Sequence, residues 1–166
     1  VFVVCMVAGM PVVFATGMVG YPEALTDPSF RGQILVMTYP LVGNYGVPDK
    51  KFWESDKIQV AGLIVSSYID TPSHHASVMT LVEWFKKESV PLIEIKDTRA
   101  LTQKLRTEGV SLGKIIVDGK DVPFDDPNLR NLVAEVSTKK ILFEGKGEKT
   151  IVLIDCGAKA NIARRI

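Results

Sequence analysis

Ser29 is the residue of this chain whose setting is best suited to binding chemistry. It ends the run Thr26-Asp-Pro-Ser29, in which Pro28 fixes its own backbone and restricts the residue before it. A hydroxyl held on so rigid a turn can donate a hydrogen bond to a carboxylate or accept one from an ammonium, with little loss of entropy. The residues alone favour a plainer role, because serine beside Asp-Pro commonly satisfies backbone groups in a local turn.

Three other motifs with reactive side chains lack the neighbours that their chemistry needs. Cys156 follows an apolar run, as an elbow nucleophile does, but the Gly-x-Cys-x-Gly spacing is absent, and we interpret it as a small buried residue. Ser111 and Lys114 match the Ser-x-x-Lys pattern of some acyl-transfer enzymes, whose other motifs are missing. The glycine-rich run 145–150 has the wrong spacing for a phosphate loop and precedes a predicted strand. None of them is expected to be catalytic.

His74 and His75 are the only histidines in the sequence. Adjacent helical side chains point about 100° apart, so these two do not easily bind one metal ion. Asp70 has the spacing of a partner ligand for His74, but Pro72 prevents a continuous helix between them. The sequence therefore predicts no metal site.

The composition is that of an ordinary globular domain. Of the 166 residues, 46% are hydrophobic and 23% are charged, and the formal net charge is +1. This balance gives no electrostatic reason to expect a nucleic acid or a membrane as partner. The apolar start over residues 1–14 is shorter than the ~20 residues of a membrane span. Two cysteines and no Asn-x-Ser/Thr sequon favour a reducing compartment, so we expect a cytoplasmic protein.

Apolar runs and turn residues predict alternating strands and helices, and hence a mixed α/β domain. A helix is expected over 73–87, with Ser73 as its N-cap and Val78 on its buried face. Another is expected from Asp97 to Gly109. The remaining helices are expected at 21–26 and 158–166, and the strands at 12–15, 33–39, 60–66, 91–95, 112–117 and 151–155. Residues 1–11 match no clear element.

Several long motifs resemble the N-terminal domain of the small, glutamine-handling chain of carbamoyl-phosphate synthetase. The family pattern, with Thr-Gly-Met-x-Gly-Tyr, Leu-Thr-Asp-Pro-Ser and Gly-Asn-x-Gly, is met from Phe14 to Gly46. The resemblance continues in four further segments, 97–106, 112–115, 132–139 and 152–164. It covers residues 12–166, whereas residues 1–11 do not look like the family's usual opening.

This resemblance implies a three-layer β/β/α fold of the swivelling type and a part in making carbamoyl phosphate from glutamine. In the family, the serine of the Thr-Asp-Pro-Ser turn reaches across the domain interface to glutamine, which assigns Ser29 to substrate binding. The implied partners are the glutaminase domain and a large synthetase subunit, or synthetase domains fused to the same chain. ATP and Mg²⁺ are expected in that synthetase portion, so no cofactor is expected in this chain. The pyrimidine and arginine pathways both stay open, although Thr71-Pro-Ser-His74 favours the eukaryotic pyrimidine multienzyme.

The resemblance also divides the chain into three parts. These are the small-chain N-terminal domain over 1–143, a charged glycine-rich linker over 144–150, and the start of a class I glutamine amidotransferase domain over 151–166. In the family, the nucleophilic cysteine of that second domain lies in a Gly-x-Cys-x-Gly-His elbow, and neither this elbow nor the His and Glu partners occur here. We therefore expect a fragment without catalytic residues, inactive on glutamine by itself.

Two other functions stay open from the sequence. One is a non-catalytic binding or scaffold module with the same fold. The other is an independent hydrolase that uses Ser29 or Ser111, for which the sequence offers no well-placed histidine as base.

Overall fold

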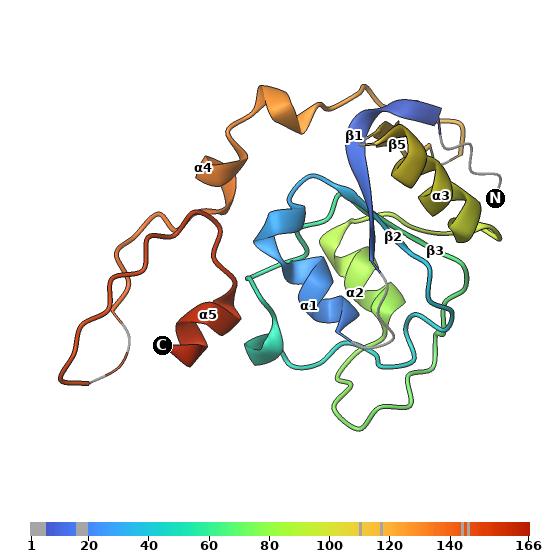
Figure 1. The fold of residues 1–166 in the computed structure, drawn as a ribbon. Coiled ribbons are helices and arrows are strands. Elements are labelled where there is room, and N and C mark those ends of the chain that lie inside the picture. The colour runs from blue at the N-terminus through green and yellow to red at the C-terminus, as the bar shows by residue number, and fades with distance from the viewer. Residues whose placement is uncertain (1–5, 16–19, 110, 117, 144, 146) are drawn as a thin grey trace.

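A five-stranded sheet in the order β4-β3-β2-β1-β5 forms the centre of the protein (Figure 1). The structure is a computed structural model that describes residues 6–15, 20–109, 111–116, 118–143, 145 and 147–166. Strands β1 to β4 are parallel to one another, and β5 runs antiparallel to β1. The strand bounds are β1 Met6–Ala15, β2 Ile34–Met37, β3 Gly62–Val65, β4 Leu92–Glu94 and β5 Leu112–Lys114. This mixed sheet with its helices confirms the predicted α/β class.

Helices cover both faces of the sheet, because alternate residues of the buried strands point to opposite sides. Leu35 and Leu63 pack in a cluster with α1 (Tyr21–Thr26) and α2 (Leu81–Glu88). Ile34 and Ile64 pack on the other side, against Leu105 of α3 (Thr98–Glu108). All residues of β2 and β3 are buried, which explains why these strands are continuous apolar runs in the sequence.

The first strand begins earlier than the sequence predicted. A strand was expected at 12–15 only, but β1 starts at Met6 and its first half pairs with β5. The structure accommodates Gly9 and Pro11 in this strand with a register shift between Val7 and Met10. Two segments lie outside the described residues, 1–5 and 16–19. The first contains Cys5, and the second contains Gly17 of the family pattern.

The predicted helix 73–87 is wrong in its first half. Helix α2 begins at Leu81, after a capping box in which Thr80 and Glu83 bond reciprocally. The preceding residues pair instead with the loop after β2, where the N–H of Val78 donates to the carbonyl of Val47. The side chain of Val78 is 61% exposed, so it does not belong to the buried face of a helix.

Two predicted helices are confirmed with their boundaries. Helix α1 spans Tyr21–Thr26, and α3 begins after Asp97, whose carboxylate accepts from the N–H of Ala100 at 2.7 Å, and ends before Gly109. Within α3, Leu105 is buried and Ala100 is exposed.

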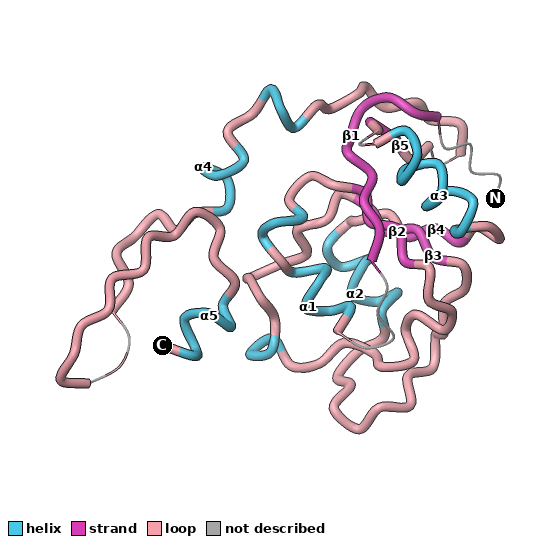
Figure 2. The backbone as a smooth tube through the Cα atoms, viewed as in Figure 1, coloured by secondary structure: helices cyan, strands magenta, loops and turns pink. Residues whose placement is uncertain are grey.

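The C-terminal part leaves the sheet and returns to the side of the molecule that carries α1 (Figures 1 and 2). It carries α4 (Leu132–Val136), a long loop and α5 (Ala160–Arg165). The strand expected at 151–155 is not formed. Val152 and Ile154 are each 82% exposed, because no strand in the described part of the chain pairs with this segment. Three short 3₁₀ helices complete the described elements: η1 Pro28–Phe30, η2 Lys50–Phe52 and η3 Pro127–Leu129. No helix in the described part of the chain is both long and apolar enough to cross a membrane.

Candidate substrate-binding turn

The turn that carries Ser29 follows directly from the end of α1. Asp27 caps η1, and its Oδ1 accepts from the N–H of Ser29 at 2.9 Å and from the Ser29 hydroxyl at 2.7 Å. The Asp27 carboxylate is buried, whereas Ser29 is exposed. The hydroxyl is thus held in one orientation at the surface. The local role that the residues alone favoured is present, and it leaves one side of the hydroxyl open.

The start of α5 lies against this turn. Nζ of Lys159 is 2.6 Å from Oδ2 of Asp27, so the carboxylate links the serine to a residue far along the chain. Just before it, Gly157 has φ +98°, and a Cβ there would lie 2.6 Å from the Val136 side chain and 3.4 Å from that of Pro28. Only glycine allows both the backbone angle and this close approach.

Asp155 shapes the segment that carries Gly157 and Lys159. Its Oδ1 accepts from the N–H groups of Gly157 and Ala158 at 2.8 and 2.7 Å, and its Oδ2 accepts from Thr138 at 2.6 Å. Desolvation by itself would raise the pKa of Asp155, but the three backbone donors together hold it below its ordinary value. The carboxylate therefore acts as a structural acceptor that folds residues 155–158 into a tight bend.

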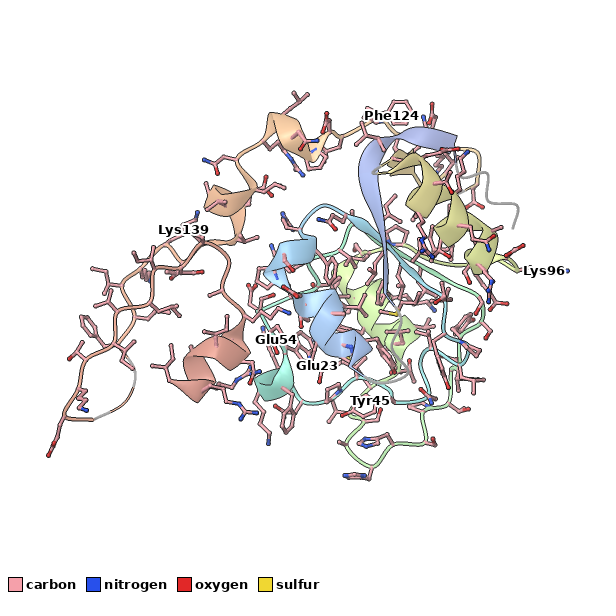
Figure 3. All side chains as sticks on the ribbon, in the orientation of Figure 1. Glu23, Tyr45, Glu54, Lys96, Phe124 and Lys139 are labelled. Carbon is pink, nitrogen blue, oxygen red and sulfur yellow. The ribbon has the colours of Figure 1, made fainter. Side chains whose placement is uncertain are left out.

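Glu54 fixes the first turn of α5 from another part of the molecule (Figure 3). Its backbone carbonyl accepts from the N–H of Ala160 at 2.9 Å, and Oε2 accepts from the N–H of Asn161 at 2.8 Å. The N–H of Glu54 donates in turn to Oγ1 of Thr26 at the end of α1, at 2.9 Å. Arg164 adds a hydrogen bond to the carbonyl of Trp53. The end of α1, the Ser29 turn and α5 therefore form one connected set of contacts.

A second brace joins the Ser29 turn to α4. Nε of Arg31 donates to Oε2 of Glu135 at 2.9 Å, and Nε of Arg130 lies 3.6 Å from Oε1 of the same carboxylate. The hydrogen bond from Arg31 and the charge of Arg130 hold the pKa of Glu135 below its ordinary value. Both ends of the segment 135–159 are thus tied to the turn that carries Ser29.

The loop 43–46, which belongs to the same family pattern as Ser29, lies apart from the serine in the structure. Asn44 and Tyr45 lie at the opposite end of α1, where the Tyr21 hydroxyl donates to the carbonyl of Gly46 at 2.8 Å. Burial raises the pKa of this phenol well above its ordinary value. Ser29 therefore shares its surroundings with residues 155–161 and not with the Gly43–Gly46 loop.

The other reactive side chains have structural surroundings. His74 packs on Tyr45 with ring centroids 4.2 Å apart, and His75 packs on His74 at 4.3 Å. No metal-binding cluster occurs among the described residues. Lys114 pairs with Asp121, lies 4.4 Å from the Phe124 ring and contacts no Ser111 hydroxyl in the described contacts. Cys156 is exposed, so its interpretation as a buried residue is wrong. The bend around Asp155 turns this side chain outward.

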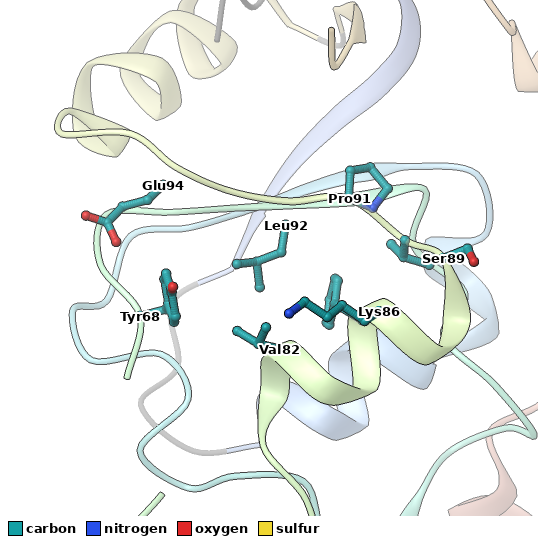
Figure 4. A pocket seen from close by; sticks show the side chains of 9 residues that line it. Tyr68, Val82, Lys86, Ser89, Pro91, Leu92 and Glu94 are labelled. Atoms are coloured by element: carbon teal, nitrogen blue, oxygen red, sulfur yellow. The ribbon is translucent and has the colours of Figure 1, made fainter. Parts of the chain in front are cut away.

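An open hollow of about 450 Å³ lies between α2 and the edge strand β4 (Figure 4). Its lining residues are Tyr68, Val82, Phe85, Lys86, Ser89, Val90, Pro91, Leu92 and Glu94. It shares no residue with the Ser29 turn. We assign it no part in the candidate site.

Three residues of the site were missed in the sequence: Asp27 as the partner of the serine hydroxyl, Glu54 and Lys159. Asp27 could have been found, because Asp two residues before Ser is the pattern of a side chain that accepts from the turn. Glu54 and Lys159 act through contacts with distant segments, for which the sequence holds no local signal.

The fold and the site define the class of this protein: an α/β domain with a surface turn, at Ser29, that is tied to the C-terminal segment. Comparison with known proteins gives the family. The family described as "Carbamoyl-phosphate synthase small chain, CPSase domain" matches residues 5–115. The chain belongs to this family, as its motifs predicted.

Three relatives show how the match extends along the chain. The multifunctional protein CAD of Squalus acanthias is 48% identical over 167 residues, covering 93% of this chain and 7% of that protein. The mitochondrial carbamoyl-phosphate synthase (ammonia) of Mus musculus is 49% identical over 163 residues, covering 92% and 11%. The arginine-specific small chain of Saccharomyces cerevisiae carbamoyl phosphate synthase is 47% identical over 166 residues, covering 92% and 40%. This chain therefore spans well under half the length of each of these relatives.

Proposed function

We propose that the chain is the N-terminal small-chain domain of a glutamine-dependent carbamoyl-phosphate synthase. In this role it supports glutamine hydrolysis in an adjoining glutaminase domain and docks the portion that makes carbamoyl phosphate. One observation carries the proposal: the Ser29 turn is joined through Asp27 to Lys159. A turn fixed to the opening of the second domain is well placed to add a contact to a substrate held by that domain.

Ser29 is the proposed glutamine-binding residue, and no residue of this chain is proposed as catalytic. The hydroxyl is exposed and held by Asp27, so it reaches a ligand without having to be ordered first. We also propose the domain division at residues 143 and 151, and the swivelling β/β/α arrangement of the family for the first domain.

The proposed partners are glutamine, the glutaminase domain and a large synthetase subunit or fused synthetase domains. ATP and Mg²⁺ would be used in the synthetase portion, and this chain would hold no cofactor. The relatives include an arginine-specific small chain and the protein CAD, so arginine and pyrimidine synthesis are both proposed as pathways. The low cysteine content suits a cytoplasmic setting.

A second candidate is a synthase that uses free ammonia. It is favoured by the 49% identity to the mouse protein, whose name specifies ammonia. Glutamine is our first choice because the Ser29 hydroxyl is exposed to a ligand on a turn that is joined to Lys159. A synthase that uses free ammonia does not need such a contact.

The full-length protein tests the choice through Ser29→Ala. The substitution should raise the KM for glutamine several-fold or more and leave ammonia-dependent carbamoyl phosphate synthesis close to normal, because ammonia bypasses the glutamine cleft. A lost neutral hydrogen bond is worth ~0.5–1.5 kcal/mol, and one to a charged group more. Ser73→Ala is the matched control, since Ser73 is exposed and its side chain makes no described hydrogen bond. Equal loss of both activities would make Ser29 structural, and full activity with ammonia alone would favour the second candidate.

Residues 1–166 alone should not hydrolyse glutamine. The expected nucleophile elbow is absent, and Cys156 lies in a bend with neither histidine in its described contacts. Ammonia release from glutamine by the purified chain, compared with its Cys156→Ala variant, measures this. Release that disappears in the variant would contradict the proposed division of labour.

A further inference from the structure

The outer edge of β4 is a row of backbone groups that face away from the sheet. On its inner side the strand pairs with β3, where the carbonyl of Pro91 accepts from the N–H of Leu63 at 3.0 Å. Successive residues of a strand direct their backbone groups to alternate sides, so Leu92 and Glu94 direct theirs away from β3. No hydrogen bond to these outward groups occurs in the described part of the chain, and β4 is the last strand on this side of the sheet. The edge is therefore able to pair with another strand.

The hollow between α2 and β4 lies along this edge (Figure 4). Its lining is mostly apolar and includes Tyr68, Val82 and Leu92. Two charged side chains also line it, Lys86 from α2 and Glu94 from β4, and Figure 4 shows Lys86 near Leu92 and Glu94 near Tyr68. Neither charge takes part in an ion pair among the described residues. The hollow is thus an apolar surface with one charge of each sign, at different positions along the edge.

A second copy of the chain fits this edge when a two-fold axis passes beside Ile93. In an antiparallel pair of two β4 strands about that axis, Leu92 of each copy lies opposite Glu94 of the other, and the outward N–H and C=O groups of both residues are satisfied. Opposite residues of such a pair have Cβ atoms about 5 Å apart on the same face of the sheet, and Leu92 faces the α2 side. Glu94 of the second copy therefore enters the hollow next to Leu92, where Lys86 lies. Leu92 of the second copy meets Tyr68, and the axis repeats both contacts.

The charges of the edge favour a second copy as the partner. A charged residue on an edge strand usually prevents pairing, because a second strand would force it against an apolar surface or a like charge. Here the carboxylate of Glu94 instead faces Lys86 of the second copy, so each charge gains an opposite partner. The formal net charge of the chain is only +1, so two copies do not repel each other strongly. The edge is therefore self-complementary, as the interface of a symmetric dimer requires.

We propose that the β4 edge and the hollow beside it form the interface at which two copies of the protein associate about a two-fold axis, which joins their sheets into one continuous sheet. The inference is independent of the proposed function, because it uses no residue of the Ser29 turn. A short ladder of backbone hydrogen bonds with one ion pair on each side is a small contact, so the association should be reversible and depend on protein concentration.

Charge reversals test the interface in the full-length protein. Lys86→Glu brings two carboxylates together across the axis, and Glu94→Lys brings two ammonium groups together. Each variant should weaken self-association by about tenfold or more, because attraction becomes repulsion in both symmetric contacts. Lys87→Glu is the matched control, since Lys87 is exposed on the same helix and does not line the hollow. Sedimentation velocity over a concentration series from ~1 to ~100 μM measures the dissociation constant of each protein.

An equimolar mixture of the Lys86→Glu and Glu94→Lys proteins gives the most specific result. In a mixed dimer each introduced carboxylate faces an introduced ammonium, and the native Lys86 of one variant faces the native Glu94 of the other. Association should return close to the wild-type level in the mixture, although each variant alone associates weakly. No effect within a single chain produces this pattern, so a mixture that associates as weakly as its components would overturn the inference.

Hydrogen exchange locates the contact on the wild-type protein. The amides of Leu92 and Glu94 should become more protected as the protein concentration rises, whereas the amide of Ile95, which already donates to the carbonyl of Val65 at 2.9 Å, should change much less. A wild type that stays monomeric throughout the series, or equal association in all variants, would overturn the inference. Protection of Leu92 and Glu94 that does not depend on concentration would overturn it as well, because another part of the same protein would then cover the edge.

Discussion

The contact between Glu54 and α5 allows a test of how firmly the C-terminal segment is docked. In Glu54→Ala the N–H of Asn161 loses its side-chain acceptor, while the N–H of Ala160 keeps the backbone carbonyl of residue 54. The side chain thus serves α5 as an N-cap supplied from elsewhere in the chain. Loss of a cap costs about 1 kcal/mol, and loss of a negative charge near a helix start costs about 0.3–1 kcal/mol.

Together these contributions amount to about 1–2 kcal/mol for local opening of α5, or a change of about fivefold to thirtyfold in the opening equilibrium. Native-state hydrogen exchange followed by NMR measures it directly at the amide of Asn161. Exchange there should accelerate by that factor, whereas amides of β2 and β3 should keep their rates. Glu54→Gln keeps an acceptor oxygen and should lose only the smaller, charge-dependent part.

Glu148→Ala is the matched control, because Glu148 is exposed and has no described partner. Unchanged exchange at Asn161 in Glu54→Ala would show that the side chain does not cap α5. Equal acceleration of the amides of α5 and of the central strands would show that Glu54 acts on global stability, and the reasoning from the local contact would be refuted.

Two further predictions concern the loops and braces around the sheet. Gly43 has φ +108° and a Cβ there would lie 2.3 Å from the carbonyl oxygen of Ile69, so Gly43→Ala should lower the free energy of unfolding by more than about 2 kcal/mol in urea denaturation. Gly20→Ala, with a left-handed helical backbone (φ +83°, ψ +10°) and no atom closer than 3.9 Å to the added Cβ, should cost only about 1 kcal/mol, and similar losses in the two variants would contradict the steric argument. Arg31→Met should raise the pKa of Glu135 towards its ordinary value of 4.5 in an NMR titration, because the hydrogen bond from Arg31 is the main cause that lowers it. Since the folded-state pKa is lowered, the brace stabilises the wild type fully above pH 4.5 and loses its effect as the pH falls below that value; an unchanged pKa in the variant would disprove the assignment.

Local signals in the sequence were sufficient for some elements and not for others. Asp97 and Gly109 mark the ends of α3 by side-chain capping and by backbone freedom, and both are read correctly from neighbouring residues. The start of α2 depends on whether residues 73–79 form hydrogen bonds within a helix or with the loop after β2. In the structure they bond to the loop. The first half of β1 likewise depends on pairing with β5, more than 100 residues later in the chain.

The candidate site shows the same difference between local signals and long-range contacts. Ser29 could be selected because a long motif with proline and glycine at fixed positions surrounds it. The residues that hold it act through contacts between segments such as Glu54 and Asn161, which are 107 positions apart. Cys156 was misjudged for the same reason: an apolar run predicts a buried strand only if a partner strand is present, and residues 151–155 have none in the described structure.

The separation between Glu54 and Asn161 also has a consequence for the order in which the protein forms during synthesis. The sheet and its three helices are complete once residue 114 has been made, whereas Lys159 and Asn161 emerge from the ribosome only later. Chains begin to fold while they are synthesised, and long-range contacts form late. We therefore expect the sheet to be folded before α5 docks. Asp27 gains its lysine partner only at that moment. The Ser29 turn thus reaches its final, charge-balanced form as one of the last events of folding, when translation has reached the C-terminal segment of this chain.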